Sequence, residues 1–131
     1  MENLQLFFQK LYKDFNERNI EAVILHMNKD VKWANAMEGG YVHGHDGVRD
    51  YWTRQFSMID PNVTPLEISD DNDRIKVRVR QVVHDLDGQL LSEDIVLHFF
   101  RLQNHKVEQF DVEPFAEGVD HGTYRSLVPV S

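Results

Sequence analysis

The sequence predicts an α+β fold in which three helices precede an antiparallel sheet. Up to about residue 58, apolar residues recur mostly at three- and four-residue spacing, which is typical of one face of an amphipathic helix. Beyond that point, apolar and polar residues mostly alternate, and turn-forming residues separate the runs, which is typical of strands. Helices and strands that are segregated along the chain favour α+β over a parallel α/β fold.

The first half of the chain divides into three helices and one short strand. Residues 16–19 end the first helix, and residues 20–27 form a second, short one. We predict a short strand at residues 31–35 and the third helix at residues 45–58. Asp60-Pro61-Asn62 closes that helix, because proline cannot continue it. The apolar face of the first helix is Leu4, Phe7, Phe8, Leu11, Tyr12 and Phe15.

The second half contains four predicted strands, at residues 64–69, 74–85, 90–102 and 106–112. The two long strands are joined through Asp87-Gly88, a dipeptide that favours a hairpin turn. Consecutive strands joined by short turns pair antiparallel, so we expect a meander.

The strand at residues 90–102 has apolar side chains on both faces. Ile95, Leu97 and Phe99 share one face, and Val96 and Phe100 share the other. Both faces should therefore be covered, and the helices can cover only one. We expect a homodimer through the face that bears Ile95, Leu97 and Phe99, since this row would otherwise be a large exposed apolar patch.

Composition narrows the class of protein. The 131 residues fit one domain, 1–131, and 41% of them are apolar, which is enough for a real core. Fourteen Lys and Arg against 22 Asp and Glu give a net charge of −8, which argues against a nucleic-acid partner. The absence of cysteine excludes disulfides and thiolate chemistry. No apolar run reaches the length of a membrane span, so we expect a cytoplasmic protein.

Three stretches of the sequence resemble one superfamily. Residues 15–23 (FNERNIEAV), 41–52 (YVHGHDGVRDYW) and 98–107 (HFFRLQNHKV) resemble the nuclear transport factor 2-like superfamily, and within it the SnoaL-like and ketosteroid-isomerase-like proteins. The resemblance extends to Pro114 and leaves residues 115–131 as a tail outside it. It implies a cone-shaped α+β barrel whose pocket lies between the first and third helices and the inner sheet face.

The positions that carry ketosteroid isomerase chemistry differ in this chain. That chemistry uses a carboxylate base, a hydroxyl and a protonated carboxyl. By resemblance the base position falls on Asn35 and the acid position on His98. The hydroxyl position falls on Leu11, with Tyr12 beside it and about 100° round the helix. A steroid isomerase of the known type is therefore not expected.

The resemblance and the strand alternation together suggest candidate site residues. His98, Asn35 and Asp94 are the candidates for acid–base chemistry or ligand orientation. Each also has a purely structural explanation. His98 could be a core histidine with its hydrogen bonds made inside the protein, Asn35 could bond the backbone of the turn after its strand, and Asp94 could be a solvated carboxylate near the hairpin end. We expect a largely apolar pocket formed by Leu11, Tyr12, Trp33, Trp52, Val82, His84, Val96, Phe100, Phe110 and Val112.

Two functions stay open on these grounds. One is a cofactor-independent enzyme of isomerase, cyclase or dehydratase type that acts on a small carbonyl compound. The other is a non-catalytic module that binds a small hydrophobic molecule on the same fold. A titratable base facing His98 would favour the enzyme. We expect no metal or nucleotide, because His43 and His45 lack a third imidazole at a recognisable spacing and no Gly-rich phosphate loop follows a strand.

Overall fold

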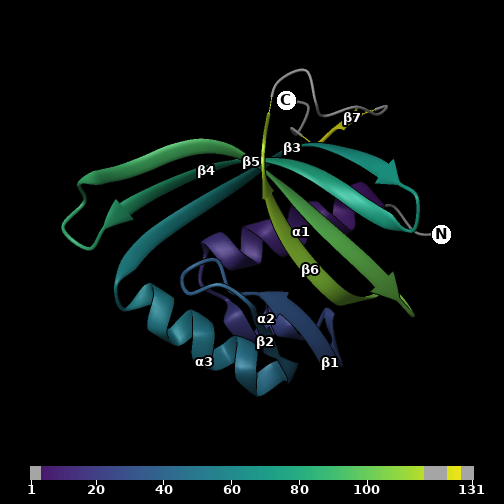
Figure 1. The fold of residues 1–131 in the computed structure, drawn as a ribbon, viewed down its shortest axis with the longest axis horizontal. Helices are drawn as coiled ribbons and strands as arrows, with labels where there is room; N and C mark the ends of the chain where they lie inside the picture. Colours follow the sequence, from purple (N-terminus) through teal and green to yellow (C-terminus); the bar gives the residue numbers. More distant parts are fainter. Residues whose placement is uncertain (1–3, 117–123, 128–131) are drawn as a thin grey trace.

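The computed structural model describes residues 4–116 and 124–127. Its helices are α1 (Leu4–Asn16), α2 (Ile20–Ile24) and α3 (Gly44–Phe56) (Figure 1). Its strands are β1 (Met27–Ala34), β2 (Tyr41–His43), β3 (Ile59–Asp71), β4 (Arg74–Asp85), β5 (Leu90–Gln103), β6 (Lys106–Pro114) and β7 (Arg125–Ser126).

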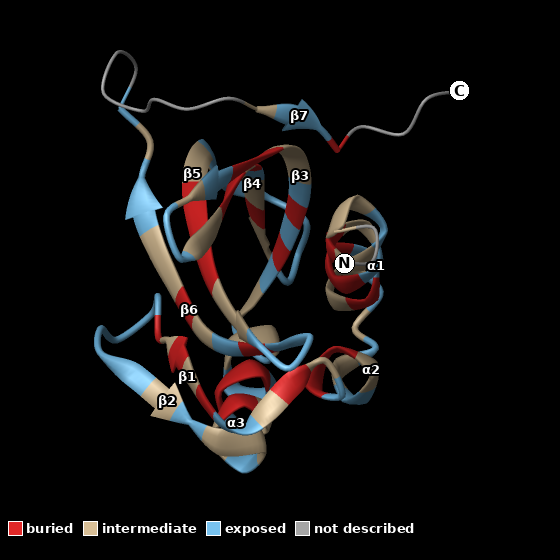
Figure 2. Ribbon diagram, turned by 90° about the vertical axis from the view of Figure 1, so that its right-hand side faces the viewer, coloured by how far each residue is buried: buried red, intermediate tan, exposed pale blue. Residues whose placement is uncertain are grey.

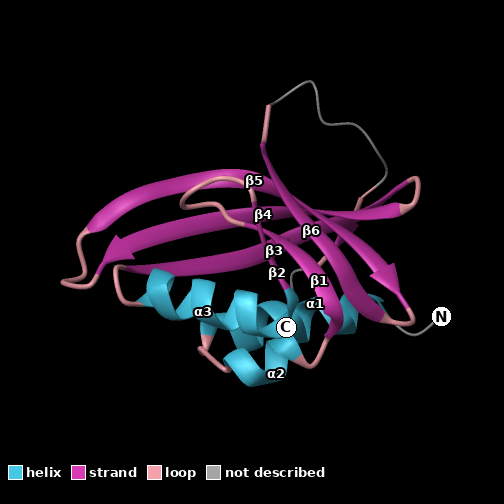
Figure 3. Cartoon of the chain, turned by 60° about the horizontal axis from the view of Figure 1, so that its bottom comes forward, coloured by secondary structure: helices cyan, strands magenta, loops and turns pink. Residues whose placement is uncertain are grey.

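The strands form one curved sheet in the order β2-β1-β6-β5-β4-β3-β7. Within the described ranges, each pair of neighbouring strands is antiparallel except β1 with β6, which is parallel. The three helices lie together on one side of this sheet (Figure 3). The predicted α+β class and order of elements are therefore confirmed, with one parallel pair that the sequence did not indicate. None of the helices in the two described ranges is long and apolar enough to cross a membrane.

Three element boundaries differ from the prediction. Met27 begins β1 and does not belong to the second helix, and β2 was not predicted. β3 begins at Ile59 and contains Pro61 and Pro65. Proline is tolerated here because β7 pairs only with Glu67 and Ile68 of β3, so the strand edge beside both prolines is open within the described chain.

The core lies between the helices and the concave face of the sheet. Figure 2 shows buried stretches on α1, α3 and β5, the elements that surround this interior. The side chains that α1 and α3 bury include Phe8, Tyr12 and Trp52. They pack against sheet residues such as Val77 and Phe100, which are at most 1% exposed. Burial of these aromatic surfaces supplies the main drive for folding.

Part of the opposite face of the sheet is covered within a single chain. Leu97 and Phe99 are only 6% and 4% exposed and Ile95 is partly exposed, so the exposed apolar row from which a homodimer was predicted is smaller than the sequence indicated. The Arg74 guanidinium lies 4.0 Å from the centre of the Phe99 ring, and the Arg78 guanidinium lies 4.2 Å from that of Tyr124. Long cationic side chains cover apolar surface with their stems and lie favourably over aromatic rings.

Residues 124–127, which lay outside the resemblance, are tied to α1 and β3. Leu127 is 1% exposed, and its backbone N–H donates to the Leu66 carbonyl at 2.8 Å. The Gln9 side-chain amide donates to the Leu127 carbonyl at 2.8 Å, and the Gln5 amide donates to the Ser126 carbonyl at 2.9 Å. This segment is therefore an integral part of the fold.

We predict that Leu127→Ala lowers the free energy of unfolding by about 2–4 kcal/mol, the usual result of emptying a fully buried leucine site. Leu86→Ala is the matched control, because Leu86 is 61% exposed and its truncation should change stability by no more than about 0.5 kcal/mol. Urea denaturation measures both. Equal stability of the two variants would show that residues 124–127 do not hold the fold together.

Candidate functional site

A cavity of about 70 Å³ lies between α1, α3 and the inner face of the sheet. Seven aromatic side chains line it: Tyr12, Phe15, Trp33, Tyr51, Trp52, Phe100 and Phe110. Hydrogen-bonding groups in the wall come from Tyr12, Tyr51, Gln55, Gln81 and His98, and the indole N–H groups of Trp33 and Trp52 have no hydrogen-bond partner among the described residues. An apolar cavity with a few placed polar groups is the usual form of a small-molecule site.

Strand alternation and register build the inner wall. On β5, Val96, His98 and Phe100 point to the same side, and β4 places Val79 and Val77 opposite the first two.

The parallel pairing of β1 and β6 sets Trp33 beside Phe110. The two rings stack with centres 4.0 Å apart and an angle of 18° between their planes. Trp52 of α3 then meets Trp33 edge to face at 5.3 Å. Such contacts hold the wall in a defined shape.

His98 and Tyr12 form a buried hydrogen-bonded pair. The Nδ1 atom of His98 lies 2.6 Å from the Tyr12 hydroxyl oxygen. Burial lowers the pKa of His98 to about 3 and raises the pKa of the Tyr12 hydroxyl well above its usual value. Both side chains are therefore uncharged at neutral pH.

The hydrogen-bond network assigns the proton between them. The Tyr12 hydroxyl has no other hydrogen-bond partner among the described residues, so its proton is satisfied only if it donates to Nδ1 of His98. A neutral imidazole that accepts at Nδ1 carries its proton at Nε2. Nε2 makes no hydrogen bond to any residue in 4–116 or 124–127, and His98 lines the cavity. We therefore assign to the cavity one imidazole N–H donor.

The structure brings together most of the predicted pocket residues. The predicted residues that line the cavity are Leu11, Tyr12, Trp33, Trp52, His98, Phe100, Phe110 and Val112. Val96 shares the inner face with His98 but does not reach the cavity wall.

Three other predicted residues lie outside the wall. Val82 pairs with Glu93 on the outer face, because the odd-numbered residues of β4 point inward here. His84 pairs with Leu90 near the tip of the hairpin, and Asp94 is exposed. The prediction that these residues line the pocket was wrong.

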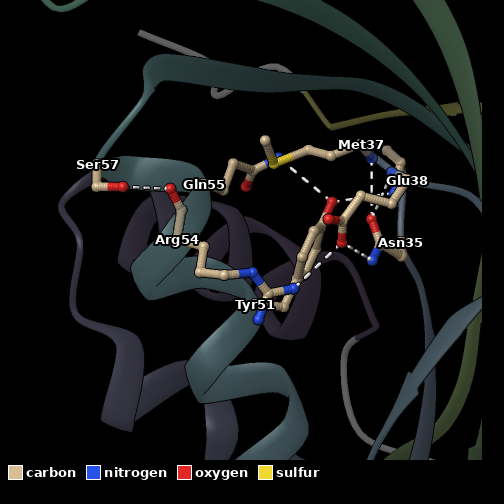
Figure 4. Close-up of polar contacts among 8 residues, drawn as sticks. Asn35, Met37, Glu38, Tyr51, Arg54, Gln55 and Ser57 are labelled. Atoms are coloured by element: carbon tan, nitrogen blue, oxygen red, sulfur yellow. Dashed lines mark hydrogen bonds and ion pairs between the residues drawn. The ribbon is translucent and has the colours of Figure 1, made fainter.

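The Asn35 side chain forms hydrogen bonds within the loop that follows β1. Its side-chain oxygen accepts hydrogen bonds from the backbone N–H groups of Met37 (3.0 Å) and Glu38 (2.9 Å). Its amide nitrogen donates to the Glu38 carboxylate at 3.0 Å (Figure 4). The amide is thus used locally, as in an ordinary Asx turn. Asn35 therefore does not line the cavity wall opposite His98, as the sequence had predicted, and a role in orienting a ligand stays a prediction.

The structure adds two groups from α3 that the sequence did not assign to the site. The Tyr51 hydroxyl oxygen accepts the backbone N–H of Ala36 at 3.0 Å, and the Gln55 amide lies 3.4 Å from that oxygen (Figure 4). Burial raises the pKa of Tyr51. Tyr51 and Gln55 are four residues apart and so share one face of the helix, and this spacing could have indicated from the sequence that they belong to the same site. Gln81 was likewise detectable, because it continues the inward row of Val77 and Val79.

No carboxylate lines the described cavity wall. The nearest acidic group along the loop, Glu38, bonds Asn35 and lies 3.3 Å from Arg54. Three metal-binding side chains do not come together anywhere in the described ranges. His45 of the HxH pair instead has its Nε2 atom 3.0 Å from the Met27 carbonyl oxygen.

A family model for the SnoaL-like domain matches residues 8–110. The chain belongs to the SnoaL-like family. No protein of curated function matches it.

Solved structures share the fold of this SnoaL-like protein. An NTF2-like protein of unknown function from Burkholderia pseudomallei is 23% identical with a TM-score of 0.75, covering 88% of this chain and 92% of that one. TerC, co-crystallised with polyporic acid, is 22% identical with a TM-score of 0.69, covering 78% and 83%. A putative polyketide cyclase from Xanthomonas campestris is 16% identical with a TM-score of 0.66, covering 80% and 84%. At these identities the likeness shows the fold alone.

The lowered pKa of His98 predicts how the stability of this SnoaL-like protein depends on pH. The imidazole of the unfolded chain takes up a proton near pH 6.5, and the buried one near pH 3. Between these values the unfolded state binds more protons, so stability falls as the pH falls through this window. Above pH 6.5, His98 contributes no pH dependence.

We therefore predict that the free energy of unfolding falls less between pH 7 and pH 5 in His98→Phe than in the parent, as measured by urea denaturation at pH 7, 6 and 5. The difference should approach about 1.4 kcal/mol per pH unit below pH 6. His43→Phe is the control for the His-to-Phe change itself, because His43 is exposed and lies outside the cavity wall. Equal slopes in the parent and His98→Phe would show that His98 titrates normally.

Proposed function

We propose that this SnoaL-like protein binds a small, uncharged, largely aromatic molecule whose carbonyl oxygen accepts the hydrogen bond of His98 Nε2–H. The observation that carries the proposal is one unpaired imidazole donor inside an aromatic wall that contains no carboxylate. A carbonyl oxygen matches an N–H donor, and the flat aromatic walls match a flat ligand.

The electrostatics of the cavity support an uncharged ligand. Neither a carboxylate nor a Lys or Arg side chain lines the described wall. A charged ligand would lose its hydration without gaining a partner of opposite charge. A neutral ligand loses less on leaving water and gains apolar contact with the rings.

The size of the cavity favours a ligand that enters from one end. A volume of about 70 Å³ holds several water molecules, each of which needs roughly 10–15 Å³ by the same kind of measure. A larger ligand therefore extends out of the cavity into solvent or displaces side chains of the wall.

A cofactor-independent isomerase or cyclase is the second candidate function. A neutral imidazole N–H, supported by the Tyr12 hydroxyl, can polarise a carbonyl and stabilise an enolate oxygen. Solved structures with the same fold include a putative polyketide cyclase and a putative isomerase. Proton abstraction also needs a base, and Asn35 and Asp94 lie outside the wall. Binding is therefore the first candidate, and catalysis requires a base from the substrate or from water.

A homodimer through the outer sheet face and a cytoplasmic location stay predictions. The physical basis for the dimer is smaller than the sequence indicated, because Leu97 and Phe99 are already buried in one chain. Light scattering at micromolar concentration tests the dimer.

Tryptophan fluorescence tests the proposed ligand class directly. Trp33 and Trp52 are the only tryptophans in the chain, and both line the cavity. Flavone, an uncharged aromatic ketone, should change their emission saturably. His98→Phe should weaken flavone binding about tenfold, since it removes the donor and narrows the cavity.

His43→Phe is again the matched control and should bind flavone like the parent, because His43 lies outside the wall. Unfolding curves of each variant confirm that it is folded. Tight binding of flavone by His98→Phe would contradict the role of His98. The absence of any saturable change in the parent would contradict the proposed ligand class.

A further inference from the structure

The cavity has a buried end and an open end with different polar groups. At the buried end, His98 and Tyr12 are 6% and 3% exposed. Among the other lining residues, Ala36 is exposed and Gln55 and Gln81 are partly exposed. We call the part of the wall that these three residues form the mouth, because it reaches solvent.

Gln81 has an unused amide at the mouth. It lies on β4 in the inward row of Val77 and Val79, and its side chain forms no hydrogen bond with any described residue. Gln55 uses only its amide N–H₂, in the 3.4 Å contact with the Tyr51 hydroxyl oxygen. A free carboxamide offers both a hydrogen-bond acceptor and two donors.

The two ends are chemically different. The buried end offers the N–H donor of His98, which suits an oxygen that accepts. The mouth offers donors and acceptors together, which suits a hydroxyl group that donates and accepts. A ligand with a carbonyl at one end and a hydroxyl at the other would satisfy both ends in one orientation only.

The sheet sets the distance between them. Gln81 pairs with Asp94, which lies four residues before His98 on β5. At about 3.4 Å per residue, the Cα positions of Asp94 and His98 are roughly 14 Å apart along the strand. With one hydrogen bond at each end, the two oxygens of the ligand would lie roughly 8–12 Å apart.

We propose that the ligand is an uncharged aromatic ketone with a hydroxyl group at its far end, and that Gln81 selects for this hydroxyl. The inference rests on the proposed function, since it assumes that a carbonyl reaches His98. It adds the orientation of the ligand, its approximate length and a specificity-determining residue.

The test compares flavone with 4′-hydroxyflavone, which differs only by a hydroxyl at the end of the molecule remote from the carbonyl. The parent should bind 4′-hydroxyflavone about fivefold more tightly than flavone, as measured by tryptophan fluorescence. Gln81→Leu, which keeps a similar volume, should abolish this preference, so that the variant binds flavone and 4′-hydroxyflavone with equal affinity. Gln89→Leu is the matched control, because Gln89 is exposed in the hairpin turn and lies outside the cavity wall.

The outcomes separate this inference from the proposed function. If flavone binds through His98 and Gln81→Leu keeps the parent's preference for the hydroxylated compound, Gln81 does not select the ligand and the inference is wrong. If the parent binds both compounds with equal affinity, the residues at the mouth do not recognise the hydroxyl group, and the inference is also wrong. If neither compound binds, the proposed function itself fails. Loss of flavone binding in Gln81→Leu would indicate a structural role for Gln81 and overturn the inference.

Discussion

The hydrogen bond between the Tyr12 hydroxyl and His98 Nδ1 is the constraint on which the site depends. It is a neutral pair in an apolar interior, and each partner satisfies a group that would otherwise be buried without a bond. It joins α1 to β5 through two residues that are 86 positions apart in the sequence. By fixing which imidazole nitrogen carries the proton, it decides what the cavity can offer a ligand. The aromatic wall strengthens this effect, because burial among these rings lowers the pKa of the imidazole and keeps it neutral.

The parts of the site that could be predicted from the sequence follow from local periodicity. Alternation on β5 correctly placed His98 and Phe100 on the inner face, and helical spacing placed Tyr12 and Trp52 toward the sheet. These predictions held because a strand or helix with one buried face has little freedom to rotate.

The parts that the sequence did not predict depend on contacts between distant segments or on single torsions. Asn35 was placed at the correct end of β1, but its amide rotates into the loop, where two backbone N–H groups are unpaired without it. The inward face of β4 depends on its register with β5, so Val82 was assigned to the wrong side and Gln81 was overlooked. On the outer face, Arg74 of β4 lies over Phe99, and Tyr124, beyond the resemblance, lies beside Arg78, so that Leu97 and Phe99 of the predicted exposed row are buried.

The central claim is that His98 is neutral at pH 7 with its proton on Nε2. Long-range ¹H–¹⁵N correlation NMR of uniformly labelled protein measures this directly, because protonated and unprotonated imidazole nitrogens resonate far apart, and His98→Phe assigns the signal. The account predicts a pyrrole-type shift at Nε2 and a pyridine-type shift at Nδ1, both unchanged between pH 8 and pH 5. The reverse pattern, or a titration near pH 6.5, would contradict it.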